Sequence, residues 1–201
     1  MRISYFTVFF GNTCYLSNMT TYISILRGIN VSGHKPVPMK ELQTLYESLG
    51  YEQVKTYIQS GNVAFATSEQ QQTLVKGNIE KAISQHFGFD VPVLVRTKAD
   101  VQKVIEENPF LNEKGIELDK LHVTFLDQLP KQENVDKLLT YDYAPDRFVL
   151  TGKEVYVYCP NGYGRTKINI TFFESKLKVG ATTRNWKTVN VLAEMVGIKK
   201  A

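Results

Sequence analysis

The stretch VKTYIQSGNVAFAT, residues 54–67, decides the fold. It predicts two strands, at residues 54–58 and 63–67, joined by a tight turn at residues 59–62. β-branched and aromatic residues fill both strands, and the last two turn residues, a glycine and an asparagine, tolerate positive φ. The stretch therefore predicts an antiparallel hairpin to which the neighbouring elements attach.

The elements on either side of the hairpin complete a recognisable order. Residues 22–29 predict a strand and residues 39–49 a helix, both before the hairpin. After it comes a helix with a capping box at Ser68, ended by Gly88, and then a strand at residues 91–96. The order β-α-β-β-α-β is typical of the ferredoxin-like unit, in which two helices cover one face of a four-stranded sheet.

The same order starts again in the second part of the chain. Strands are predicted at residues 121–126, 147–151, 154–159 and 179–183, and helices near residues 135–139, 166–178 and after 185. Thr97 and Asp100 are expected to cap a short helix that closes the first part. The sequence thus predicts an α+β fold of two tandem ferredoxin-like halves, at residues 19–107 and 121–201, with antiparallel sheets and helices packed on one face. The polar residues 108–120 are expected to link them.

The N-terminal residues 1–18 differ from the rest. They imitate a signal peptide only faintly, because polar residues interrupt the apolar run and no small-residue cleavage site follows. We interpret them as a leader outside the fold. The alternative is a short extra strand.

Composition and charge exclude several classes of protein. The 201 residues include 24 Lys and Arg against 20 Asp and Glu, a net charge of +4 that permits nucleic acid or a phosphorylated ligand as partner without requiring either. Two cysteines are too few for a disulfide framework. No apolar run reaches the roughly 18 residues of a membrane span. We expect a soluble, cytoplasmic protein.

The stretch LRGINV, residues 26–31, places a charge where a strand should be apolar. Arg27 shares its predicted strand face with Ile23 and Ile25. Either Arg27 reaches a cleft at the end of the strand, or it pairs with a carboxylate at the sheet edge. Ser60, in the hairpin turn, lacks both a Gly-x-Ser-x-Gly surrounding and a suitably spaced histidine, so a structural turn is favoured over a nucleophile.

The stretch PNGYGRTK, residues 160–167, connects a predicted strand to a predicted helix. Glycines let backbone N–H groups approach a ligand, and a helix N-terminus favours anions. Arg165 and Lys167 add positive charge at that point, although the spacing of a Walker A loop is absent. The alternative is a glycine-rich connection in which Thr166 caps the helix.

The stretch ATTRNW, residues 181–186, leads into the last predicted helix. Asn185 suits the N-cap and Trp186 a packing anchor, which leaves Arg184 unexplained. The preceding helix runs away from the glycine-containing loop and the chain then returns. We therefore expect Arg184 to lie at the same end of the sheet as Arg165.

Together these stretches predict one anion-binding pocket. We expect Arg165, Lys167 and Arg184 to face it, Asn161, Tyr163 and Thr183 to line it, and Arg27 and Asn30 to join it if the halves pack with those ends together. The alternative is that each arginine stabilises its own loop. The three histidines are scattered, so neither a metal site nor a cofactor is expected. His122 alternates with Thr124 on a polar strand face and is expected to be solvated.

The ordered set of these stretches resembles the bacterial family known as domain of unknown function 1697. The matching segments are residues 26–31, 37–39, 56–63, 108–110, 121–125, 161–167 and 182–189. The resemblance implies the same duplicated α+β fold. It supplies no activity, cofactor or catalytic residue.

Three functions follow from the residue chemistry. The first is binding of a phosphate-containing ligand, such as a nucleotide or nucleic acid. The second is a small enzyme that uses its cations on a phosphorylated or carboxylated substrate. The third is a module that binds a protein partner without chemistry. The sequence leaves open whether the protein is an enzyme and what its oligomeric state is.

Overall fold

The computed structural model describes residues 19–31 and 33–199. The predicted leader, residues 1–18, lies outside the described residues. The first half contains the following elements: β1 (Thr20–Leu26), α1 (Met39–Ser48), β2 (Glu52–Tyr57), β3 (Asn62–Thr67), α2 (Gln72–Phe87), β4 (Val93–Thr97) and α3 (Lys98–Glu106). Its strands form an antiparallel sheet in the order β2-β3-β1-β4, so the quoted hairpin is β2 and β3.

The second half repeats this arrangement. It contains β5 (Leu121–Leu126), α4 (Gln132–Leu139), β6 (Arg147–Thr151), β7 (Glu154–Tyr158), α5 (Ile170–Leu177), β8 (Ala181–Asn185) and α6 (Trp186–Met195). The sheet order is β6-β7-β5-β8, which matches the first sheet strand for strand. Between the halves, residues 108–120 include two short 3-10 helices and the buried side chain of Phe110.

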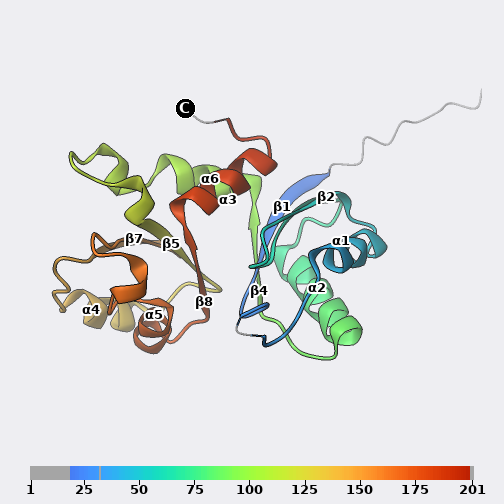
Figure 1. Ribbon diagram of the computed structural model, residues 1–201, viewed down its shortest axis with the longest axis horizontal. Coiled ribbons are helices and arrows are strands. Elements are labelled where there is room, and N and C mark those ends of the chain that lie inside the picture. The colour runs from blue at the N-terminus through green and yellow to red at the C-terminus, as the bar shows by residue number, and fades with distance from the viewer. Residues whose placement is uncertain (1–18, 32, 200–201) are drawn as a thin grey trace, which may run out of the picture.

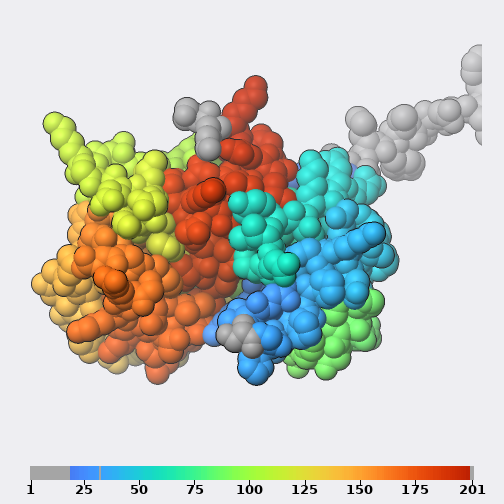
Figure 2. Space-filling view, viewed as in Figure 1, coloured from blue at the N-terminus to red at the C-terminus, as the bar shows by residue number. Residues whose placement is uncertain are grey.

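Each sheet has helices on its outer face and a shared core on its inner face. Helices α1 and α2 cover the first sheet, and α4 and α5 cover the second (Figure 1). Alternation along β1 sends Tyr22 and Leu26 into the outer core and Ile23 and Ile25 into the inner one. The inner core also takes in residues of β5, β7, α3 and α6, and β8 and α6 lie between the halves in Figure 2. The predicted α+β fold of two similar antiparallel halves is confirmed, and the inner faces prove to be covered as well.

The predicted helix ends and turns agree with the structure where a glycine or a capping side chain fixes the backbone. Gly88 ends α2 in the left-handed conformation with φ 79°. Thr97 and Asp100 form the expected capping box at the start of α3. In the hairpin turn Gly61 takes a positive φ of 73°, as predicted. Asn62 instead begins β3, and Ile58 takes the second positive φ, of 48°.

Three boundaries differ from the sequence-based expectation. The expected capping box at Ser68 does not form, because α2 begins at Gln72 and no side chain caps its first turn. Helix α5 begins at Ile170 and is capped by Asn169, so Thr166 is not its N-cap. The last strand, β8, covers Ala181–Asn185 rather than residues 179–183. This shift decides where the side chain of Arg184 points.

Arg96 in β4 ties the first half to the second. It is 2% exposed, yet its Nη2 donates to the backbone oxygen of Leu126 at 2.6 Å and its Nε donates to Oε1 of Glu154 at 2.8 Å. Leu126 ends β5 and Glu154 begins β7. A buried guanidinium is tolerated because its donors meet a carboxylate and carbonyls.

Arg184 in β8 makes the corresponding contacts in the other direction. Its Nη2 donates to the backbone oxygen of Leu26 at 2.9 Å, and its Nε donates to Oδ1 of Asn62 at 2.7 Å. Leu26 ends β1 and Asn62 begins β3. The two arginines also occupy matching register positions, since Arg96 lies opposite Ile23 and Arg184 lies opposite Val123. The halves are therefore held together by a reciprocal pair of arginines.

Candidate anion-binding site

The loop at residues 160–167 is fixed by its glycine and its threonine. Gly162 takes a φ of 88°, which L side chains rarely adopt, and its N–H donates to the Cys159 carbonyl at 2.8 Å. A single 3-10 turn, Tyr163–Arg165, follows. The buried Thr166 hydroxyl donates to Oδ2 of Asp146 at 2.6 Å and accepts from the Ile168 N–H at 3.1 Å. The loop is thus attached to the segment that precedes β6.

Three of the predicted site residues line one pocket. Asn161, Arg165 and Lys167 face residues 142–146 across a cavity of about 380 Å³. Both cations are exposed, and neither forms an ion pair with any of the residues at 19–31 and 33–199. These three residues therefore share one cavity, and their binding of an anion stays a prediction.

Two carboxylates line the same cavity and moderate its charge. Asp146 is held by the Thr166 hydroxyl, and Oδ1 of Asp142 accepts from the Ala144 N–H at 3.0 Å. Both carboxylates thereby accept a hydrogen bond from within the protein, Asp142 from its own segment and Asp146 from the opposite loop, whereas Arg165 and Lys167 form no ion pair among the described residues. Residues 142–146 were missed in the sequence because a turn of this composition carries no charge pattern that links it to residues 161–167.

Tyr163 and Thr183 lie together on the outer face of the second sheet. The Tyr163 hydroxyl donates to Oγ1 of Thr183 at 3.0 Å, and that oxygen lies 2.7 Å from Oγ1 of Thr124. The Tyr163 ring stacks on His122 with centroids 4.5 Å apart. These contacts anchor the 3-10 turn beneath Arg165 to the sheet. His122 is half-buried rather than solvated, and its burial lowers its pKa from the usual value.

Arg184 does not reach this pocket. Thr183 and Arg184 are neighbours in β8, so their side chains point to opposite faces of the sheet. The five N–H groups of Arg184 donate to Asn62 Oδ1, Thr182 Oγ1 and the carbonyls of Thr183, Leu26 and Ser60. Burial lowers its pKa to about 10. The structure therefore corrects the expected single pocket: Arg165 and Arg184 are separated by the sheet.

Arg27 and Asn30 are also engaged within the protein. Arg27 forms a two-point ion pair with Glu174 of α5, with N–O distances of 2.6 and 2.7 Å. This is the carboxylate pairing that the sequence left open. The side chain of Asn30 donates to the carbonyls of Val37 and Gln59 and accepts from the Val37 N–H. Both residues shape the loop after β1, away from the cavity that contains Arg165.

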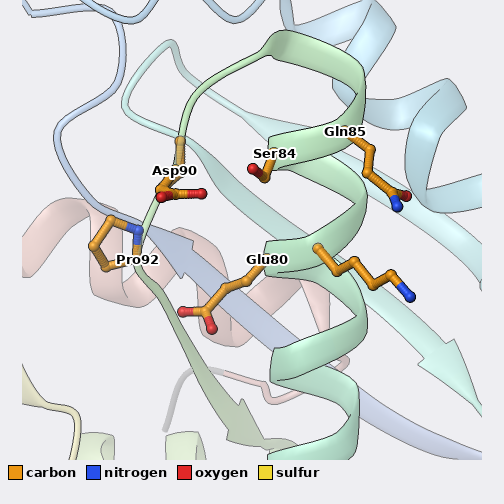
Figure 3. A pocket seen from close by; sticks show the side chains of 7 residues that line it. Glu80, Ser84, Gln85, Asp90 and Pro92 are labelled. Atoms are coloured by element: carbon orange, nitrogen blue, oxygen red, sulfur yellow. The ribbon is translucent and has the colours of Figure 1, made fainter.

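A separate hollow beside α2 carries no site. Figure 3 shows Glu80 and Ser84 of α2 on the side of the helix that faces Asp90 and Pro92 of the following loop. Oε1 of Glu80 accepts from the N–H of the first β4 residue at 2.9 Å, so the carboxylate supports the strand. Among the described residues, no three His, Cys, Asp or Glu side chains gather closely enough to hold a metal ion. Within the same ranges, every helix is too short or too polar to cross a lipid bilayer.

The fold and these contacts define a two-sheet α+β protein whose halves share a core. The family described as "Protein of unknown function (DUF1697)" matches residues 19–156, and the chain belongs to this family. The sequence-based assignment is confirmed, and the loop at residues 160–167 lies beyond the matched part. The fold is similar to that of the conserved bacterial protein SP0830 from Streptococcus pneumoniae, with a TM-score of 0.71 and 23% identity over 89% of this chain and 99% of that one. No curated protein matches the sequence.

Proposed function

We propose that the protein binds a small phosphate-bearing ligand in the cavity between residues 142–146 and 161–167. One observation carries the proposal: Arg165 and Lys167 line the same cavity of about 380 Å³ without an ion pair among the described residues. Small-ligand pockets commonly measure about 300–1,000 Å³. Arg165 supplies the fork of donors that suits a phosphate, and Lys167 adds a point charge.

The covered sheets favour a small ligand over nucleic acid. Ferredoxin-like domains that bind RNA use an open sheet face on which bases stack. Here helices cover the outer face of each sheet, and the inner faces are buried in the shared core. A nucleotide or another compact phosphate compound therefore fits the proposal better than an oligonucleotide.

The proposal is tested by calorimetric titration with inorganic pyrophosphate and with ATP at low and high salt. We expect saturable binding that weakens as salt is added, because the attraction of exposed charges is screened. Arg165→Ala and Lys167→Ala should each weaken binding about threefold to thirtyfold without lowering the melting temperature. Lys114→Ala, at an exposed lysine away from the cavity, is the matched control. Equal weakening by all three variants, or no binding of either phosphate compound, would contradict the proposal.

A further inference from the structure

A larger cleft, of about 540 Å³, lies where the two halves meet. Helix α3 and the residue after it form one wall, with Lys103, Val104 and Glu107. The loop after β5, residues 127–129, and the β6–β7 hairpin, residues 151–154, form the other. The cleft is distinct from the cavity that contains Arg165, with which it shares no lining residue.

Tyr156 is a polar residue at the base of this cleft. The residue is 2% exposed and lines the cleft from β7. Its hydroxyl forms no hydrogen bond with any residue that the structure describes. Burial, with the charges of Glu154 and Glu107 nearby, raises its pKa, so the phenol stays protonated at neutral pH and can both donate and accept. Among the described residues, the fully buried side-chain polar atoms without a partner are Tyr51 Oη and Asn108 Nδ2. The Tyr156 hydroxyl therefore keeps a small exposed surface, through which it can bond to water or to a ligand in the cleft.

The charged residues around Tyr156 are balanced in sign. Of the carboxylates in the cleft, Asp100 is engaged in the α3 cap and Glu154 pairs with Arg96. The remaining charged side chains are the carboxylates Asp127 and Glu107 and the ammonium groups Lys103 and Lys153, none of which forms an ion pair within the described ranges. Two opposite pairs of charges favour a dipolar ligand over one of a single sign.

Leu129 and Tyr156, which the second half contributes to the cleft, have no counterparts in the first half. Leu129, three residues after the end of β5, is 67% exposed at the rim. Ile29, three residues after the end of β1, is 2% exposed. The register also places Ala64 of the first sheet where Tyr156 stands in the second, opposite Ile23 and Val123 respectively. The first half therefore forms the same fold without a tyrosine or an exposed leucine at the matching positions. Forming the fold does not explain why the second half has Tyr156 and Leu129.

From these contacts we propose that the cleft binds a zwitterionic α-amino acid with a large apolar side chain. The ammonium group of the ligand meets Glu107 and Asp127, its carboxylate meets Lys103 and Lys153, and the Tyr156 hydroxyl bonds to its polar end. Its side chain lies against Leu129 and Val104.

The test is calorimetric titration of the full chain with L-phenylalanine, phenethylamine and 3-phenylpropanoate. The last two lack the carboxylate and the ammonium group respectively. We expect L-phenylalanine to bind at least about tenfold more tightly than either, because each analogue leaves one pair of charges without a partner. No saturable binding at about 10 mM, or equal binding of an analogue, would overturn the proposal.

Variants assign the binding to this cleft. Tyr156→Phe keeps the ring and should weaken L-phenylalanine binding about threefold to tenfold. Glu107→Gln, at an exposed position, provides a second variant should the first lower the melting temperature. Glu106→Gln is the control, because Glu106 accepts from Gln102 and lies outside the cleft. Unchanged binding in both cleft variants would refute the site, and Arg165→Ala should leave it unaffected whatever its effect on phosphate binding.

Discussion

Replacing Arg184 with methionine removes the second of the two reciprocal arginines while keeping a side chain of similar length. The change leaves five acceptors without their donor, among them the buried side chain of Asn62 and the carbonyls of Leu26 and Ser60. An orphaned buried acceptor costs about 1–3 kcal/mol, although a carbonyl near the surface recovers water. The packing of the new side chain offsets part of the loss.

We expect Arg184→Met to lower the free energy of unfolding by about 3–5 kcal/mol, because several buried acceptors lose their donor at once. This is a large part of the 5–15 kcal/mol of a typical domain. Urea denaturation followed by circular dichroism measures this loss, provided that the slope with urea stays unchanged. Arg165→Met, at an exposed position, is the control and should change stability by less than about 0.5 kcal/mol. A loss below about 1 kcal/mol in Arg184→Met would refute the reasoning, because water would then replace the arginine at little cost.

Two further predictions concern the hairpin turn and the outer sheet face. Gly61→Ala should destabilise the protein by more than about 1 kcal/mol in thermal unfolding, since its Cβ would lie 2.6 Å from Cδ1 of Ile29 and its φ is 73°. Gly77 lies within α2, where an added Cβ would meet open space, so Gly77→Ala should stabilise the protein by about 0.4–1 kcal/mol. Equal effects of the two alanine substitutions on stability would contradict the role of the positive φ and the close contact at Gly61. His122, with a lowered pKa, supports stability above its ordinary value of 6.5, and that support is lost as pH falls below it. The decline below about pH 6.5 should shrink in His122→Gln, and an identical pH profile would show that the histidine is not the cause.

The sequence predicted the order of the elements because hydrophobic periodicity and turn residues are local. Gly88, Gly61 and the Thr97–Asp100 capping box each act within a few residues, and each lies where the pattern indicated. The candidate site was only partly predictable. Arg165 and Lys167 are two residues apart in one loop, and their shared cavity follows from that proximity.

The expectation for Arg184 failed through a boundary error of two residues. A strand that ended at residue 183 would have left Arg184 in a loop, free to turn toward Arg165. Because β8 continues to Asn185, alternation instead directs Arg184 into the other half. The partners of Arg184 and Tyr156 depend on how the halves pack, which no local pattern encodes.

The reciprocal arginines also bear on how the chain folds as it is synthesised. When the first half leaves the ribosome, Arg96 has emerged with it. Its acceptors at Leu126 and Glu154 follow later in the chain and have not yet emerged. Until those acceptors arrive, the guanidinium of Arg96 stays hydrated, because it has no protein partner on the inner face. The inner face of β4 therefore stays exposed to water at this stage. Translation of β7 supplies the missing carboxylate. Arg184 of β8, which is synthesised after β7, then donates in return to Asn62 of the first half. The acceptors at the ends of β1 and β3 in the first sheet therefore wait for a donor from the second sheet.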